Sequence, residues 1–280
     1  MDFWYSENHT DSVKLSIKID KQIYSAKSEY QRIDVFESYE FGRFLALDGI
    51  MMLTEKDEFV YHEMLVHVPM AINPDIKNVL IIGAGDGGIV RELAGYASIS
   101  SMTLVEIDSC VVDVCKQYLP QTASSLNDLR LTIHYQDGLK FIRTAKDFDL
   151  IIVDSTDPFG PGEGLFTKEF YGNCYNALTE NGICVNQLGS PYYRADAEAM
   201  TRAYSKLRTV FPITSAYQAH IPTYPSGHWL FGYASKKFGY LDINEKWDAL
   251  NITTQYYNTE LHKGAFALPT YVKKMLEIGI

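Results

Sequence analysis

The sequence predicts an α/β protein in which a small antiparallel β-domain, residues 1–55, precedes a seven-stranded, mostly parallel sheet within residues 56–280. Two patterns predict this fold. Apolar residues alternate with polar ones through much of the first 55 residues, as they do along half-buried strands. After Pro74, short apolar runs alternate with helical patterns, as they do in doubly wound sheets.

The N-terminal strands are predicted from period-two patterns and turn signals. Residues 13–19 alternate apolar side chains with lysine and serine, and further short runs follow at 33–36, 44–47 and 50–53. Asp48-Gly49 is a strong hairpin signal between the last two runs. A domain this small buries little core on its own, so we expect it to pack on the rest of the chain or on another subunit.

A helix is predicted to follow the β-domain, with Thr54 as its N-cap and Asp57 completing an approximate capping box. Pro69 and Pro74 are expected to close this region. Tyr61 and His62 lie within the helix, where an isolated histidine is more often a packed residue than a functional one.

The larger sheet is predicted from seven apolar runs, at 78–82, 102–107, 131–134, 150–153, 183–187, 213–219 and 229–234. Helical patterns lie between them at 88–96, 109–118, 139–144, 168–178 and 194–209. The last two strands are joined without a helix, so the final strand is predicted to be antiparallel. This arrangement favours a Rossmann-like sheet of the nucleoside-binding methyltransferase type over a dinucleotide-binding one.

The stretch VLIIGAGDGG at residues 79–88 predicts a buried strand, a tight turn and the start of a helix. Three of its four glycines, Gly83, Gly85 and Gly88, satisfy the dinucleotide-binding spacing. Asp86, however, would oppose a pyrophosphate at the helix N-terminus, where the backbone favours anions. The sequence leaves open whether Asp86 only caps the helix or binds a cationic ligand.

Carboxylates follow four successive strands of the predicted sheet: Asp86, Glu106, Asp137, and Asp154 with Asp157. Because ligands bind outside the carboxyl ends of such strands, these side chains are expected to meet at one edge, unless each is only a cap or turn residue. Glu106 is placed to accept from ribose hydroxyls and Asp137 from an adenine amino group. A cluster of carboxylates in a cleft repels itself unless positive charge enters. The remaining carboxylates therefore predict a cationic ligand.

Two loops adjoin this edge. Residues 154–167 are rich in proline and glycine, as active-site lids are, and an inert surface loop is the alternative. Residues 221–227, IPTYPSG, form a second rigid loop in which Tyr224 could present its ring or hydroxyl to a cation.

The charge and the cysteine and histidine content of the chain disfavour several classes of binding partner. The chain has 35 acidic and 25 basic residues, a formal net charge of −10, which disfavours nucleic acid and anionic membranes. Its four cysteines lack C-x-x-C spacing and its histidines lack ligand spacing, so we expect reduced thiols, no metal site and a cytoplasmic location. The first ten residues do not resemble a secretory signal, and no apolar run is long enough to span a membrane.

Together, these motifs resemble those of the polyamine aminopropyltransferase family. The resemblance is carried by six stretches spread over the chain: LDGIMMLTEKDEFVYHEM at 47–64, VLIIGAGDGG at 79–88, VEID at 105–108, DSTDPFGPGEGLF at 154–166, IPTYPSG at 221–227 and YYNTELHKGAFALP at 256–269. It implies transfer of an aminopropyl group from decarboxylated S-adenosylmethionine to putrescine, giving spermidine and methylthioadenosine. That donor is a co-substrate, so no cofactor is implied. A homodimer or homotetramer is also implied.

The resemblance implies roles for individual residues. The donor would be bound by Gln31, Leu47, Asp86, Glu106, Asp137, Gly138 and Pro161. The acceptor would be bound by Trp4, Tyr61, His62, Asp86, Asp154, Asp157, Gln187 and Tyr224. Asp154 would be the proton acceptor, assisted by Tyr61. Two positions depart from the family pattern: Ala84 replaces a common glycine in the turn, and Met52 stands where some relatives have glutamine.

Three other functions stay open at this stage. A putrescine N-methyltransferase using S-adenosylmethionine would share most of these motifs. A non-catalytic polyamine-binding protein would keep the pocket, although Asp154 and Tyr61 argue against it. A nicotinamide dehydrogenase is disfavoured by Asp86. The sequence does not distinguish putrescine from cadaverine, agmatine or spermidine as the acceptor.

Overall fold

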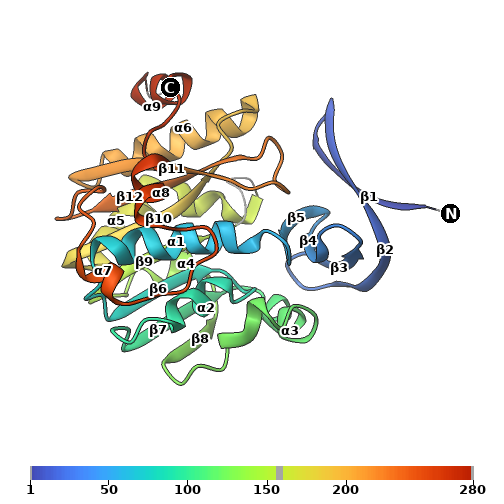
Figure 1. Cartoon of the computed structure of the whole chain (residues 1–280), viewed down its shortest axis with the longest axis horizontal. Coiled ribbons are helices and arrows are strands. Elements are labelled where there is room, and N and C mark those ends of the chain that lie inside the picture. The colour runs from blue at the N-terminus through green and yellow to red at the C-terminus, as the bar shows by residue number, and fades with distance from the viewer. Residues whose placement is uncertain (1, 156–159, 279–280) are drawn as a thin grey trace.

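The N-terminal part of the chain forms a five-stranded antiparallel sheet in the computed structural model, which describes residues 2–155 and 160–278 (Figure 1). Its strands follow one another in chain order: β1 (Phe3–Thr10), β2 (Val13–Lys27), β3 (Arg32–Ser38), β4 (Gly42–Leu47) and β5 (Ile50–Thr54). The sequence pattern missed β1. One of its inward positions is Glu7, a buried carboxylate that accepts a hydrogen bond from the Met51 N–H at 2.8 Å, so the apolar alternation is interrupted.

Helix α1 (Glu58–Ile72) connects the two sheets. The predicted N-cap was wrong: the helix begins after Asp57, and the Thr54 hydroxyl donates to Asp57 Oδ1 at 2.6 Å instead of accepting from a helix N–H. The prediction that Pro69 closes this region was also wrong, because Pro69 lies inside the helix, which continues to Ile72.

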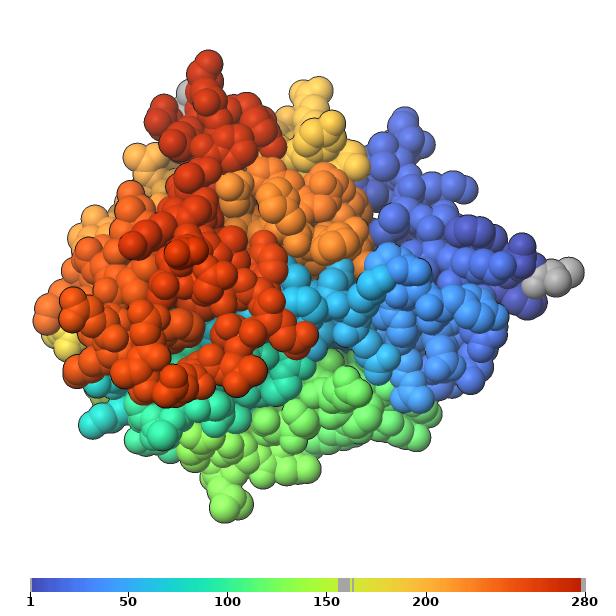
Figure 2. All heavy atoms as spheres, viewed as in Figure 1, coloured from blue at the N-terminus to red at the C-terminus, as the bar shows by residue number. Residues whose placement is uncertain are grey.

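Packing on every side explains why α1 tolerates that proline. Almost all its residues are buried, polar ones included. The segment after β12, coloured orange-red to red in Figure 2, covers much of the face shown there. Its residues Trp247, Tyr257 and Ala265 share a core with α1. Tertiary contacts of this extent outweigh the local cost of a proline.

The second sheet has seven strands in the order β11-β12-β10-β9-β6-β7-β8. They are β6 (Asn78–Gly83), β7 (Ser101–Glu106), β8 (Leu131–Tyr135), β9 (Phe148–Asp154), β10 (Leu178–Gly189), β11 (Ile213–His220) and β12 (His228–Ser235). Strands β10, β9, β6, β7 and β8 pair in parallel, and β12 pairs antiparallel with both β10 and β11. The prediction of an antiparallel final strand is confirmed.

Helices cover both faces of this sheet. The helices are α2 (Gly88–Ala94), α3 (Ser109–Tyr118), α4 (Gly138–Phe141), α5 (Lys168–Ala177), α6 (Arg194–Arg208), α7 (Lys246–Ala249), α8 (Thr259–Ala265) and α9 (Thr270–Ile278), with 3-10 turns η1 (Thr122–Ser125) and η2 (Gly160–Phe166). Val79 and Ile81 of β6 point to the core shared with α1, α2 and α3, whereas Leu80 and Ile82 point to the core shared with α5, α6 and α9.

The order of the strands reverses between β6 and β9. The chain runs outward from β6 through β7 to β8, then returns to β9 on the other side of β6. Gly83 pairs with Asp154 at this point, and a Cβ on Gly83 would lie 1.8 Å from the Asp154 carbonyl oxygen. Only glycine permits this approach, which brings the turn after β6 beside the end of β9. Ligands bind at such a reversal in open α/β sheets.

Within the described ranges, the structure contains no helix whose length and apolar character would suffice to cross a lipid bilayer.

Candidate active site

Asp154 and Tyr61 form the centre of the candidate site. Asp154 is the last residue of β9, and Tyr61 reaches it from α1, where its hydroxyl donates to Asp154 Oδ1 at 2.5 Å. The Tyr61 ring packs between Phe231 and Tyr224, with centroids 5.3 and 6.1 Å away. This packing fixes one oxygen of the Asp154 carboxylate.

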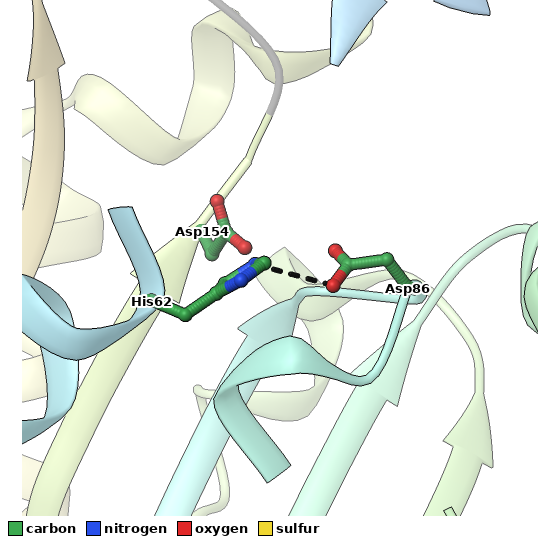
Figure 3. Close-up of side chains that lie close together, drawn as sticks. All are labelled: His62, Asp86 and Asp154. Carbon is green, nitrogen blue, oxygen red and sulfur yellow. Dashed lines mark ion pairs between the residues drawn. The ribbon is translucent and has the colours of Figure 1, made fainter. Parts of the chain in front are cut away.

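Asp86 lies opposite Asp154, on the turn between β6 and α2 (Figure 3). Its Oδ1 accepts a hydrogen bond from the Gly88 N–H at 2.7 Å. The same oxygen lies 3.2 Å from His62 Nε2. Asp86 therefore supports the start of the helix and also pairs with a histidine, so capping is not its only contact.

The three side chains perturb one another's ionisation. Burial raises the pKa of Asp154 to about 7, and the charge of Asp86 adds to this effect, while His62 and the Tyr61 hydrogen bond oppose it. Burial alone would lower the pKa of His62, but Asp86 and Glu58 raise it to about 10. Burial would raise the pKa of Asp86, but His62 outweighs burial and lowers it. At neutral pH the site thus holds an ionised Asp86, a protonated His62 and an Asp154 that titrates.

Several of the residues predicted to bind the donor meet where the two sheets adjoin. Glu106 ends β7 and is buried, and its Oε1 accepts from the Asp108 N–H at 2.9 Å. Burial raises the pKa of Glu106 to about 7. Gln31, from the loop between β2 and β3, donates to Asp108 Oδ2 at 3.0 Å. A hydrogen-bonded path through Asp108 therefore joins Gln31 to Glu106.

Asp137 and Gly138 follow β8, on the far side of β7. Asp137 caps α4 by accepting from the Leu139 N–H at 2.8 Å. Leu47 ends β4 and is buried. Pro161 belongs to η2, and its side chain falls outside the description; Asp157 lies outside the described residues.

The residues predicted to bind the acceptor are divided between two places. Gln187 of β10 donates to the Ser155 carbonyl oxygen at 3.1 Å, directly after Asp154, while its own Oε1 is buried without a partner among the described residues. Tyr224 packs on Tyr61 and donates to the Met52 carbonyl oxygen at 2.6 Å. Trp4 lies instead on β1, the edge strand of the N-terminal sheet, with its side chain 58% exposed.

Within residues 2–155 and 160–278, two groups of side chains combine histidine with carboxylates: His62 with Asp86 and Asp154, and Glu63 with His67 and Glu92. Protein contacts already occupy these groups. His62 lies between Glu58 and Asp86, and Glu63 accepts three backbone hydrogen bonds from residues 255–257. We therefore assign no metal ligand among them.

Sequence reasoning missed Glu58, Arg91 and the main role of Asp57. Glu58 stands four residues before His62, a spacing that places ion-pairing side chains together on a helix, and this signal could have identified it. Arg91 contacts Glu58 only because α2 packs on α1. The short-range sequence pattern does not contain that contact.

Asp57 fastens the loop of residues 221–227 to the start of α1. Its Oδ2 accepts from the Thr223 N–H at 3.0 Å and from the Thr223 hydroxyl at 2.6 Å, and its Oδ1 accepts from Thr54. Asp57 is buried, so Asp57→Ala would leave buried donors unpaired. We expect the free energy of unfolding in urea to fall by about 3 kcal/mol.

The matched control for that variant is Asp75→Ala, which removes an exposed ion pair with Lys246. Its expected change is within about 0.5 kcal/mol. Equal losses in the two variants would show that Asp57 does not anchor the loop.

Comparison with known proteins gives consistent matches over the whole chain. A model described as "Spermine/spermidine synthase domain" matches residues 58–245, and one described as "Spermidine synthase tetramerisation domain" matches residues 3–55. The polyamine aminopropyltransferase of Alkaliphilus oremlandii is 65% identical over 280 residues, covering 99% of both chains. That of Clostridium perfringens strain SM101 is 64% identical over 279 residues, again covering 99% of both.

Solved structures agree in fold. A spermidine synthase crystallised with the transition-state analogue AdoDATO superposes with a TM-score of 0.96 at 45% identity, covering 99% of this chain and 95% of that one. The spermidine synthase of Thermotoga maritima gives a TM-score of 0.94 at 45% identity, with 99% and 94% covered. The predicted fold class, a Rossmann-like sheet with a small antiparallel N-terminal domain, is thus confirmed.

Proposed function

Since the chain belongs to the spermine/spermidine synthase family of polyamine aminopropyltransferases, we propose that it acts as a spermidine synthase. The proposed reaction transfers the aminopropyl group of decarboxylated S-adenosylmethionine to putrescine. The observation that supports it most strongly is the pair of carboxylates, Asp154 and Asp86, at the reversal of strand order, with Tyr61 holding Asp154.

The proposed step is a direct displacement. A nitrogen of putrescine attacks the methylene carbon next to the sulfonium, the new N–C bond forms, and the C–S bond breaks with its electron pair passing to sulfur. The products are spermidine and methylthioadenosine. Holding nitrogen, carbon and sulfur in line removes much of the entropic barrier. The sulfonium leaves as a neutral thioether, which is a good leaving group, so we propose no cofactor.

Asp154 is the proposed proton acceptor. Putrescine has amine pKa values of about 10, like lysine, so one ammonium must lose a proton before it attacks. Transfer to an ordinary aspartate would cost about 8 kcal/mol, and a carboxylate with a pKa of about 7 halves that cost. Burial of Asp154 therefore contributes directly to the proposed reaction.

Asp86 is proposed to select the donor. Decarboxylated S-adenosylmethionine ends in an ammonium without a carboxylate, whereas S-adenosylmethionine carries both. An ionised Asp86 attracts the first and repels the carboxylate of the second. The lowered pKa of Asp86, set by His62 against the effect of burial, keeps it ionised at neutral pH. Glu106, Gln31 and Asp137 are proposed to hold the adenosine part.

The acceptor is tested by competition. The protein is given decarboxylated S-adenosylmethionine with equal concentrations of putrescine, cadaverine, agmatine and spermidine, and the amine products are quantified by mass spectrometry. We expect spermidine as the main product. A different dominant amine would change the assigned acceptor, and no amine product at all would overturn the proposed function.

The rate is expected to depend on the ionisation of Asp154. A proton acceptor must be deprotonated to act, so kcat/KM is expected to fall about tenfold per pH unit below a midpoint near 7 and to level off above it. Initial rates from pH 5.5 to 8.5 measure this acidic decline in kcat/KM. A flat profile over that range would contradict the assignment of Asp154.

We further propose that the protein is a homo-oligomer, a dimer or tetramer, which the match of residues 3–55 to a tetramerisation domain supports. Exposed apolar side chains on the N-terminal sheet, Phe3, Trp4 and Ile50, are consistent with a subunit interface. The proposed cytoplasmic location is supported by four cysteines that are free thiols.

A further inference from the structure

We infer that Glu58, anchored by Arg91, is a positioning residue that holds His62 as a buried cation against Asp86 and thereby controls the carboxylate pair Asp86 and Asp154. The inference rests on the proposed function for its kinetic consequence. Its structural part concerns only the charge state of His62.

Four charged side chains form a continuous row from α2 through α1 to the candidate site. Arg91 of α2 makes two contacts with Glu58, from Nη1 to Oε1 at 2.6 Å and from Nη2 to Oε2 at 2.9 Å. Glu58 Oε2 lies 2.5 Å from His62 Nδ1, and His62 Nε2 lies 3.2 Å from Asp86 Oδ1. Signs alternate along this row, so each charge has an opposite neighbour.

The geometry fixes the protonation of His62. Both ring nitrogens face carboxylate oxygens, which only accept hydrogen bonds when ionised. A neutral imidazole donates from one nitrogen only, whereas the imidazolium donates from both. His62 is only 2% exposed, so water does not replace a missing contact. The arrangement is therefore satisfied fully only when His62 is charged.

The His62 ring packs against the start of α2, next to Asp86. A Cβ on Gly88 would lie 2.2 Å from His62 Cε1, so the first residue of α2 lacks a side chain where the ring packs. Gly88 also donates to Asp86. The ring, the helix start and the Asp86 carboxylate are thus packed as one unit, and His62 influences the reaction through Asp86 and Asp154.

The charged groups around His62 come from four elements: Glu58 from α1, Asp86 from the turn after β6, Asp154 from β9 and Arg91 from α2. Loss of the Glu58 charge would leave Asp86 as the main partner of the imidazolium, so the pKa of His62 would fall. A neutral His62 no longer offsets the repulsion between Asp86 and Asp154. The pKa of Asp154 would then rise, and its active, ionised form would need a higher pH.

Glu92 offers a matched control. It is also a glutamate paired with Arg91, from Oε1 to Nη2 at 2.7 Å, but its other oxygen lies 3.2 Å from His67, five residues after His62 along α1. Glu58→Gln and Glu92→Gln each remove one charge from the same guanidinium. Only the first removes a partner of His62.

The kinetic test compares the pH dependence of kcat/KM for the two variants, with decarboxylated S-adenosylmethionine and putrescine. We expect Glu58→Gln to move the acidic part of the profile upward by about one pH unit and to lower kcat/KM at pH 7 about fivefold. Glu92→Gln is expected to leave this part of the profile within about 0.3 unit of wild type. Equal displacement in both variants, or none in Glu58→Gln, would overturn the inference.

A second measurement needs neither activity nor the Glu58→Gln variant. Nitrogen-15 NMR of histidine-labelled wild-type protein reports the charge of each imidazole, with His62 assigned by its loss in His62→Gln. We expect His62 to remain an imidazolium at pH 8.5. A neutral His62 at that pH would overturn the inference even if Glu58→Gln failed to fold. An inactive wild type with a charged His62 would instead contradict only the proposed function.

Discussion

Asp154→Asn is expected to lower kcat with decarboxylated S-adenosylmethionine and putrescine by about 10³-fold, the middle of the range for a lost general base. The amide cannot take the proton that the attacking ammonium must lose, although it has almost the shape of the carboxylate. Tyr61 donates to Asp154 Oδ1, and an asparagine oxygen accepts the same bond, so the packing is expected to survive. The measurement is steady-state release of methylthioadenosine.

The control for that variant separates chemistry from binding. Asp147→Asn changes an exposed aspartate just before the same strand, at a left-handed backbone position that asparagine also tolerates, and is expected to leave kcat unchanged. Calorimetry should give affinities for methylthioadenosine within about threefold in wild type and Asp154→Asn, since the charge lies away from the adenosine. Unchanged turnover in Asp154→Asn would remove Asp154 from the mechanism.

Asp86→Asn is expected to reduce the preference for decarboxylated S-adenosylmethionine over S-adenosylmethionine by about 10²-fold, expressed as the ratio of the two kcat/KM values. The variant removes both an attraction for the ammonium and a repulsion of the carboxylate, and like-charge contacts of this kind cost several kcal/mol. Parallel assays with the two donors at subsaturating concentration measure the ratio directly.

Asp137→Asn is the matched control, because Asp137 lies two strands from Asp86 and is proposed to contact the adenine, which both donors share. It should lower kcat/KM for both donors by the same factor and leave their ratio unchanged. An unchanged ratio in Asp86→Asn would show that the carboxylate does not select the donor.

Much of the larger sheet was predictable because its strands are apolar on both faces and its connections carry turn and cap residues. Helix α3 was predicted at its observed bounds, Ser109–Tyr118, since Asp108 caps it through its own side chain. The hairpin between β11 and β12 followed from the absence of a helical pattern between them. Strand β1 was missed because an inward position holds the carboxylate of Glu7, which pairs with distant backbone.

The site was predictable where it lies at strand ends and unpredictable where it depends on packing. Asp86, Glu106 and Asp154 were found because parallel strands end at one edge of the sheet. The sequence did not show that Asp86 already has a cationic partner, since the pairing with His62 requires α1 to cross the turn after β6. The contact of Arg91 with Glu58 likewise depends on two helices whose packing no local pattern specifies.

The ion pair of Asp86 with His62 changes the charge balance that a cationic ligand would meet. Among these five groups alone, His62 and Arg91 offset two of the three charges carried by Asp86, Glu58 and an ionised Asp154, and Arg91 also pairs with Glu92. One negative charge therefore remains, and the raised pKa of Asp154, caused first by burial and then by Asp86, reflects it. The site is one positive charge short when Asp154 is ionised, which an ammonium group of the substrate would supply.

The most direct test of the proposed reaction gives the wild-type protein each donor separately, with putrescine as the acceptor, and identifies both products by mass spectrometry. We expect spermidine and methylthioadenosine from decarboxylated S-adenosylmethionine, and no transfer from S-adenosylmethionine. Formation of N-methylputrescine and S-adenosylhomocysteine from S-adenosylmethionine, without spermidine from the decarboxylated donor, would contradict it.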